Sequence, residues 1–136
     1  MQEAAPALLF KRPATLLDRQ HYIYTEAKER HIVDLVFLDA EANELILVEL
    51  KRGKLTEAHL NQIRRYLDNA HKSPLLRTFL EKGTTIRGIL ATAEESEFEP
   101  PMADVSVCRI DKRQTLHVLK QLRVRRLESM ASALHE

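Results

Sequence analysis

Three ionisable residues are set in or beside apolar runs of the sequence. Asp34 interrupts the run IVDLVFL at residues 32–38, and Glu49 and Lys51 end the run ELILVELK at residues 44–51. Two carboxylates and a main-chain carbonyl form the all-oxygen site that a hard cation such as Mg²⁺ prefers. Such an ion polarises a phosphoryl oxygen and lowers the pKa of a bound water, which a nearby lysine holds or helps to deprotonate. The pattern therefore indicates metal-assisted hydrolysis of phosphodiester bonds.

Two strands must position these groups. Residues 32–38 are a nearly continuous run of β-branched and large apolar side chains, which predicts a strand covered on both faces. Residues 44–51 predict the next strand, and the polar turn at Asp39–Asn43 suits a hairpin between the two. Because alternate residues of a strand share a face, Glu49 and Lys51 should point into the same space.

A helix is predicted after the second strand. Thr56 suits the N-cap position, and apolar residues recur at helical spacing over Glu57–Ala70. Gln62 and Tyr66 are four residues apart, so they should lie on one side of this helix. A second helical segment is predicted at Leu75–Glu81.

The order of the elements predicts an α/β fold, with a central mixed sheet of four to five strands flanked by helices. The helix connects the strand that ends at Lys51 to a strand at Thr84–Ala91, and such a crossover joins parallel strands. Gly88 marks a position in that strand where another backbone approaches closely. The remaining predictions are strands at His21–Glu26 and Val105–Ile110 and helices at Ala4–Phe10, Ala14–Asp18 and Lys112–Arg126. The segment TLHVL at residues 115–119 could instead form a strand.

The bulk composition limits the class of protein. A chain of 136 residues, 44% hydrophobic and 30% charged, suits one globular domain. A formal net charge of +1 excludes a basic nucleic-acid coat, so any nucleic-acid surface must be local. The single cysteine, Cys108, excludes a disulfide framework and a cysteine-based zinc site, which fits a reducing, cytoplasmic location. No apolar run reaches the roughly 18 residues of a membrane span, so we expect no membrane partner.

The arrangement of Asp34 and Glu49-Leu50-Lys51, with fourteen residues between Asp34 and Glu49, resembles the Asp…Glu-x-Lys signature of the PD-(D/E)XK nuclease superfamily. This superfamily includes restriction endonuclease-like and RecB-like nucleases. Gln62-x-x-x-Tyr66 resembles the helix motif of RecB-like members. From about Gln20 to Ile110, the sequence is similar to the NucS/EndoMS-type nuclease domain and to YhcG-type nucleases.

The resemblance implies a role for each residue of the motif. Asp34 and Glu49 would bind the metal ion, with the backbone carbonyl of Leu50 as a third ligand. Lys51 would act on the nucleophilic water. The residues that would orient this water or the backbone phosphate are Gln62 and Tyr66.

Members of the superfamily often add a glutamate from their first helix. Glu3 is the candidate here, and Glu26 is the alternative nearer in sequence to the motif. The proline that usually precedes the first acid is replaced by Val33. Many members of the superfamily lack that proline.

Each of these residues also has a purely structural interpretation. A buried, unpaired carboxylate costs several kcal/mol, so a structural role for Asp34 is hard to support. Glu49 and Lys51 could form a solvated strand end with a cross-pair, and Gln62 and Tyr66 could be ordinary residues at a helix edge. Four basic residues near the expected cleft suit phosphate contacts, or else a solvated helix face: Arg52, Lys54, Arg64 and Arg65.

We therefore expect a restriction endonuclease-like domain that hydrolyses DNA with Mg²⁺ or Mn²⁺. The expected division is a single domain over 1–136, with an N-terminal helical segment at 1–20, a core at 21–110 and a C-terminal helix at 111–136. A partner subunit, an additional domain or the structure of the DNA would supply targeting. The chain could be one module of a larger protein, or one subunit of a homodimer, since related domains often cut as pairs. The alternatives are a catalytically inactive module that keeps the fold to bind nucleic acid or to assemble, and a nuclease that acts on RNA.

Overall fold

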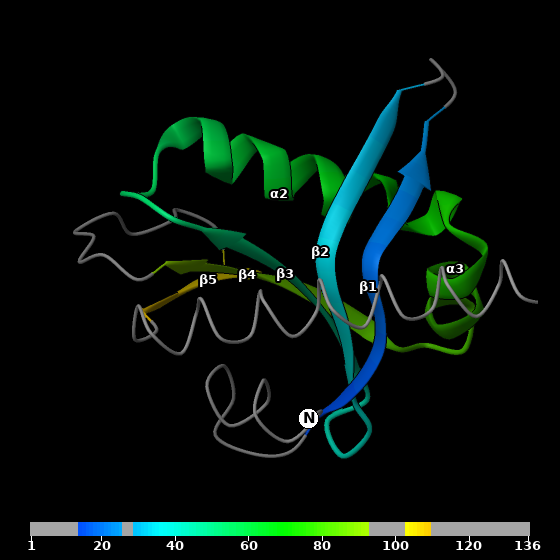
Figure 1. Cartoon of the computed structure of the whole chain (residues 1–136). Coiled ribbons are helices and arrows are strands. Elements are labelled where there is room, and N and C mark those ends of the chain that lie inside the picture. The colour runs from blue at the N-terminus through cyan, green and yellow to red at the C-terminus, as the bar shows by residue number, and fades with distance from the viewer. Residues whose placement is uncertain (1–13, 26–28, 93–102, 110–136) are drawn as a thin grey trace, which may run out of the picture.

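The computed structural model of the chain describes residues 14–25, 29–92 and 103–109. The strands in these residues are β1 (Thr15–Tyr24), β2 (Arg30–Asp39), β3 (Glu44–Lys51), β4 (Thr85–Thr92) and β5 (Val105–Arg109). Between β3 and β4 lie helix α2 (Glu57–Asn69), a short 3₁₀ turn η1 (Ala70–Lys72) and helix α3 (Pro74–Glu81) (Figure 1). Among the helices that the structure describes, none combines the length and apolar character needed to cross a membrane.

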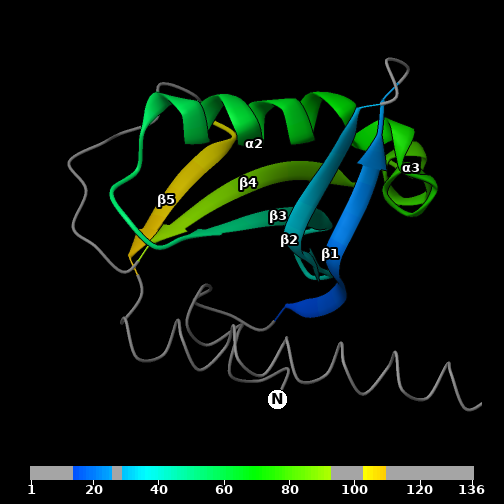
Figure 2. The same ribbon diagram turned by 45° about the horizontal axis from the view of Figure 1, so that its top comes forward.

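The strands form one mixed sheet in the order β1-β2-β3-β4-β5. β1, β2 and β3 pair antiparallel, whereas β3, β4 and β5 pair parallel, so the predicted crossover between parallel strands is confirmed. Figure 2 shows α2 lying across one face of the sheet, while β1 and β2 rise together past the helix. The bounds predicted for the strand at residues 44–51 are those of β3.

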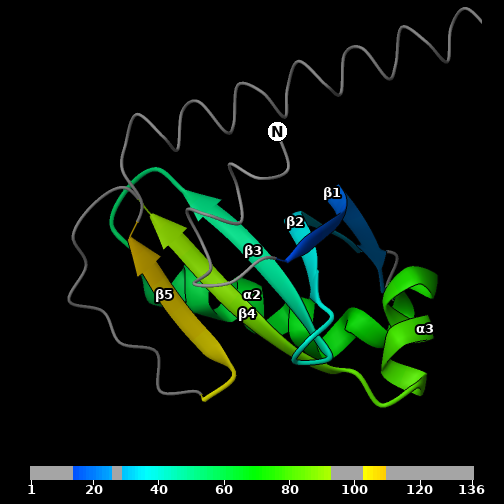
Figure 3. The same ribbon diagram turned by 90° about the horizontal axis from the view of Figure 1, so that it is seen from below.

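Buried apolar side chains lie on both faces of the sheet. The first core cluster joins strand residues such as Val36, Leu47 and Leu90 to Ile63 and Leu67 of α2. The second core cluster lies on the opposite face, which Figure 3 shows from below, and it includes Leu35, Phe37, Ile46, Val48, Ile89 and Ala91. Both faces of β3 are therefore buried, and so are both faces of β2 from Val33 on, as predicted for the run at residues 32–38. Ile32, the first residue of that run, is exposed instead.

The helix predicted at Ala14–Asp18 is wrong, because β1 begins at Thr15. Leu16 packs against the second core cluster and Leu17 against the first. Neighbouring residues reach opposite faces in a strand but not in a helix, so pairing with β2 decides the local structure. The helices predicted at Ala4–Phe10 and Lys112–Arg126 lie outside the described residues. The single-domain division stays a prediction.

A hydrogen-bonded chain of side chains ties the edge strand β1 to α3. His21 Nδ1 lies 2.7 Å from Asp18 Oδ2, and His21 Nε2 lies 2.7 Å from Ser73 Oγ. Ser73 is the N-cap of α3 and its Oγ also accepts the Leu76 N–H at 3.3 Å. The hydroxyl is buried, at 1% exposure of the residue, so this Asp–His–Ser arrangement is a structural connection closed to substrate.

Gly88 of β4 lies directly beneath α2. A Cβ atom there would lie 2.6 Å from Cδ1 and 2.8 Å from Cγ1 of Ile63, which is fully buried. The close approach predicted at Gly88 therefore exists, but its partner is a helix side chain and not a backbone. The absence of a side chain at this residue sets how closely α2 packs on the sheet.

We expect Gly88→Ala to lower the free energy of unfolding by about 1–3 kcal/mol, since Ile63 must leave a packed position. Chemical denaturation would measure the loss, and adding Ile63→Val in the same chain should restore part of it. Gly53→Ala is the matched control, because a Cβ there meets nothing within 4 Å. Equal stability of Gly88→Ala and Gly53→Ala would contradict this account of the packing.

Candidate functional site

Asp34 lies where β2 separates from β3. The antiparallel ladder between these strands ends where Leu35 pairs with Val48. One more step in the same register sets Asp34 opposite Glu49. The Asp34 carboxylate accepts the backbone N–H of Leu50, with 2.7 Å between Oδ2 and the nitrogen. This hydrogen bond holds the carboxylate beside the end of β3.

Glu49 is the buried acid of the site, with 3% of the residue exposed. Its Oε2 has no hydrogen-bond partner among the described residues. Burial, followed by the neighbouring Asp34 carboxylate, raises the pKa of Glu49 to about 9. Tyr66 and the positive charge of Lys51 act in the opposite direction. A buried carboxylate oxygen without a partner is costly, so this position is suited to a cation.

Tyr66 of α2 faces the two carboxylates from above the sheet. Its hydroxyl donates a hydrogen bond to the backbone carbonyl of Ile32, 3.0 Å away. Burial, and then the charges of Glu49 and Asp34, raise the pKa of Tyr66, so the phenol remains protonated and acts as a donor. Gln62 lies one turn earlier on the same helix and is half-buried. Gln62 and Tyr66 thus lie on the same helix, as predicted, and Tyr66 is the one that lies near the two acids.

Lys51 ends β3 and is half-buried. Its positive charge lowers the pKa of Glu49, and after burial it is also a cause of the lowered pKa of His59. The ammonium group is therefore near enough to both the acidic site and the first turn of α2 to act on them electrostatically. His59 Nδ1 accepts the backbone N–H of Thr56 at 3.2 Å and so caps the helix.

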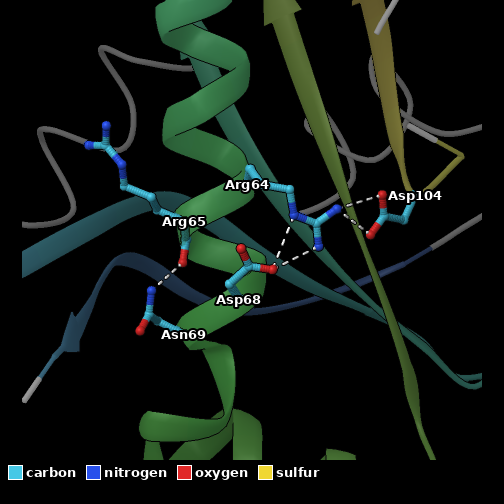
Figure 4. A network of polar contacts seen from close by, with 5 residues as sticks. All are labelled: Arg64, Arg65, Asp68, Asn69 and Asp104. Atoms are coloured by element: carbon cyan, nitrogen blue, oxygen red, sulfur yellow. Dashed lines mark hydrogen bonds and ion pairs between the residues drawn. The ribbon is translucent and has the colours of Figure 1, made fainter. Parts of the chain in front are cut away.

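The four basic residues differ in their surroundings. Arg52, Lys54 and Arg65 are exposed. Arg64 Nη1 lies 2.9 Å from both carboxylate oxygens of Asp104, and its Nε lies 3.1 Å from Asp68 Oδ1 (Figure 4). Figure 4 also shows Arg64 and Arg65 leaving α2 in different directions. The Arg64 guanidinium links α2 to Asp104, the residue before β5. Phosphate binding by the four basic residues stays a prediction.

Comparison with solved structures defines the fold. A repair endonuclease from Pyrococcus abyssi superposes with a TM-score of 0.50 over 74% of this chain and 40% of its own, at 20% identity. The structure of an EndoMS–dsDNA complex superposes with a TM-score of 0.53 over 81% of this chain and 41% of its own, at 16% identity. This chain has the restriction endonuclease-like nuclease fold. The α/β class and the mixed sheet of four to five strands predicted from the sequence are confirmed, and the described residues form five strands.

The sequence comparison also points to a nuclease of this kind. Endonuclease NucS from Pyrococcus abyssi (strain GE5 / Orsay) is 32% identical over 91 residues. That match covers 66% of this chain and 33% of the relative, so the chain spans about a third of the length of the curated protein. No family model matches the chain. The resemblance to NucS/EndoMS-type nucleases is therefore confirmed.

The residues present fit a divalent cation in this nuclease fold. Asp34 and Glu49 supply two carboxylates, and the Oε2 atom of Glu49, which has no hydrogen-bond partner among the described residues, is available as a metal ligand. Within residues 14–25, 29–92 and 103–109, no group of three His, Cys, Asp or Glu side chains is placed to hold a metal ion. The candidate third acids Glu3 and Glu26 lie outside those ranges, so their roles stay predictions.

Sequence reasoning left two contributors out of the site. Ile32 takes part through its backbone carbonyl, which no side-chain motif identifies. His59 lies near Lys51 because it caps α2, and the spacing Thr56-x-x-His59 is a signal that could have placed it. The structure brings Asp34, Glu49 and Tyr66 together, with Lys51 beside them.

Proposed function

We propose that this chain hydrolyses phosphodiester bonds of DNA with Mg²⁺ or Mn²⁺. The observation that carries the proposal is the buried Glu49 carboxylate, which lies beside Asp34 with one oxygen free of hydrogen bonds. A buried carboxylate with a strongly raised pKa, set beside a second acid, is more often found at a functional site than elsewhere in a protein. The relationship to Endonuclease NucS and the likeness to an EndoMS–dsDNA complex support DNA as the substrate.

Asp34, Glu49 and the backbone carbonyl of Leu50 would hold the ion. When bound, the ion stabilises negative charge on the phosphate and lowers the pKa of its water. Lys51 would hold that water through its ammonium group. The one hydroxyl proton of Tyr66 is donated to the Ile32 carbonyl, so Tyr66 would orient the water by accepting a hydrogen bond from it. Gln62 supplies a second polar group from the same side of α2.

The experiment that tests this function compares wild type with Lys51→Ala. Single-stranded, double-stranded and branched DNA are incubated with Mg²⁺ or Mn²⁺, and cleavage is followed on denaturing gels. We expect wild type to cut and Lys51→Ala to be slower by roughly 10²–10⁴-fold, the usual contribution of a positioned proton-transfer group. Lys82→Ala is the matched control, because Lys82 is an exposed lysine at the end of α3.

The same assay decides between the alternatives. Equal rates for wild type and Lys51→Ala would contradict the catalytic proposal. DNA binding by a wild type that never cuts would instead support a module that keeps the fold for binding or assembly. An RNA panel tests for an RNA substrate, since a phosphodiester site does not itself distinguish the sugars. Targeting by a partner subunit, a further domain or the structure of the DNA stays a prediction, as does a homodimer.

A further inference from the structure

The end of the β1–β2 hairpin carries exposed side chains that the proposed reaction does not use. Among the described residues, the large hydrophobic side chains that are exposed are Tyr24, at 62%, and Ile32, at 36%. Both belong to this hairpin, and Arg30 beside them is also exposed. Exposed apolar surface gathered at one place indicates an interaction site more strongly than the same residues scattered singly.

These side chains form one continuous surface. Tyr22 pairs with Ile32 and Tyr24 pairs with Arg30 in the antiparallel ladder, so all four lie on one face of the hairpin. The rings of Tyr22 and Tyr24 are stacked, with centroids 6.2 Å apart and planes inclined by 14°. Arg30 Cζ lies 5.6 Å from the centroid of the Tyr22 ring. We call these four residues the tyrosine–arginine patch.

The chemistry of the patch matches unpaired nucleobases. A base presents a flat π-face that stacks on an exposed aromatic ring, and the phosphates on either side of it are attracted to an arginine. Among the described residues, Glu29 directly precedes Arg30, and its carboxylate lies 3.9 Å from His31, whose ring centroid is 5.9 Å from that of Tyr66. Paired bases in a duplex are stacked on each other and offer no such face, so the patch favours single strands.

The patch lies next to the candidate active site. Ile32 belongs to the patch, and its backbone carbonyl accepts the hydrogen bond from Tyr66. At about 3.3 Å per strand residue, the patch extends from roughly 7 to 13 Å along β2 from Asp34. Because one strand of a duplex rises about 3.4 Å per nucleotide and an unpaired strand extends further, that distance corresponds to at most about four nucleotides.

We propose that the tyrosine–arginine patch binds unpaired bases of a DNA strand whose neighbouring phosphate lies at Asp34 and Glu49. This inference rests on the proposed function, because it assumes that the acids receive a phosphate. It assigns to Tyr24 the role of a stacking platform and to Arg30 that of a phosphate contact. The chain would thereby prefer DNA with a frayed or single-stranded segment beside the cut over a fully paired duplex.

The test measures binding without cleavage, by fluorescence anisotropy in EDTA. The probes are dye-labelled single-stranded oligothymidine, a blunt duplex and the same duplex with a single-stranded overhang. Tyr24→Ala should weaken binding to the single strand and the overhang by roughly tenfold, the usual effect of losing one stacked base. The blunt duplex should bind as before, and Tyr24→Phe, which keeps the ring, should behave as wild type.

Arg30→Ala tests the charged part of the patch. It should reduce the slope of log affinity against log salt by about 0.7 on the single strand, which corresponds to one lost phosphate contact. Arg77→Ala is the matched control, because Arg77 is an exposed arginine of α3 that pairs with Glu81 on the same helix. An unchanged slope for Arg30→Ala would overturn the phosphate contact.

Other outcomes separate this inference from the proposed function. Equal loss by Tyr24→Ala on all three probes, or no loss on any, would overturn the stacking role even if the chain cuts DNA. Loss confined to single-stranded probes in a chain that never cuts would support the patch and refute the nuclease. A Tyr24→Ala variant that only converts a dimer to a monomer in sedimentation would show that the patch contacts a second copy, which also overturns the proposal.

Discussion

Replacing Glu49 by glutamine should abolish DNA cleavage and, without divalent cations, make the folded protein more stable. The cleavage rate should fall by at least about 100-fold, since even groups that merely hydrogen-bond to metal ligands contribute about 10–100-fold. Stability should rise because at pH 8 the Glu49 carboxyl, which is ionised in the unfolded chain, must take up a proton on folding, whereas the neutral amide carries no such cost. Gel-based cleavage and denaturant unfolding in EDTA at pH 8 measure the two effects on one purified sample.

The opposite signs of these two effects are the decisive part of the prediction. A residue that only supports the fold would lose activity and stability together. Glu41→Gln is the matched control, because Glu41 is an exposed glutamate in the turn between β2 and β3. Cleavage that persists in Glu49→Gln would remove this carboxylate from the site.

The stability of the metal-free protein should depend on pH through Glu49. The pKa of this carboxyl rises from its ordinary 4.5 to about 9 on folding, because the group is buried near Asp34. A raised pKa in the folded state means that its stabilising contribution is complete below pH 4.5 and is lost as pH rises through about 9. Over that range the contribution changes by up to about 1.4 kcal/mol for each pH unit.

The measurement is the free energy of unfolding of Glu49→Gln minus that of wild type, both in EDTA. Taking this difference cancels the titration of the groups that the two proteins share. The difference should be near zero around pH 4.5 and should grow in favour of the variant towards pH 8. Adding Mn²⁺ or Mg²⁺ at pH 8 should stabilise wild type, by about 2.7 kcal/mol at a hundredfold excess over Kd, and leave the variant unchanged. A pH-independent difference would contradict the buried-carboxylate interpretation.

The acidic half of the site is predictable from sequence because it is local. A short polar turn between two apolar runs sets the register of β2 on β3, and that register brings Asp34 to Glu49. The period of two residues in a strand then sets Lys51 on the same face as Glu49. Helical spacing links Gln62 to Tyr66, but the contact between Tyr66 and the Ile32 carbonyl required the tertiary structure.

Contacts between distant segments were not predictable. The pairing of Arg64 with Asp68 follows from a spacing of four residues on a helix, but the pairing of Arg64 with Asp104 depends on how α2 lies over the sheet. The early start of β1 was missed for a similar reason, since only its pairing with β2 distinguishes a short strand from a short helix there. Neither arrangement leaves a periodic signal in the sequence.

Three neighbouring residues of α2 are each held by a different part of the fold. Ile63 packs where Gly88 lacks a side chain, Arg64 is bound by Asp104, and Tyr66 is bound by the Ile32 carbonyl. Successive residues of a helix point about 100° apart, so these contacts prevent α2 both from rolling about its axis and from sliding along it. The conformational entropy of placing the Tyr66 hydroxyl is therefore lost during folding, and none of it has to be lost again when substrate binds.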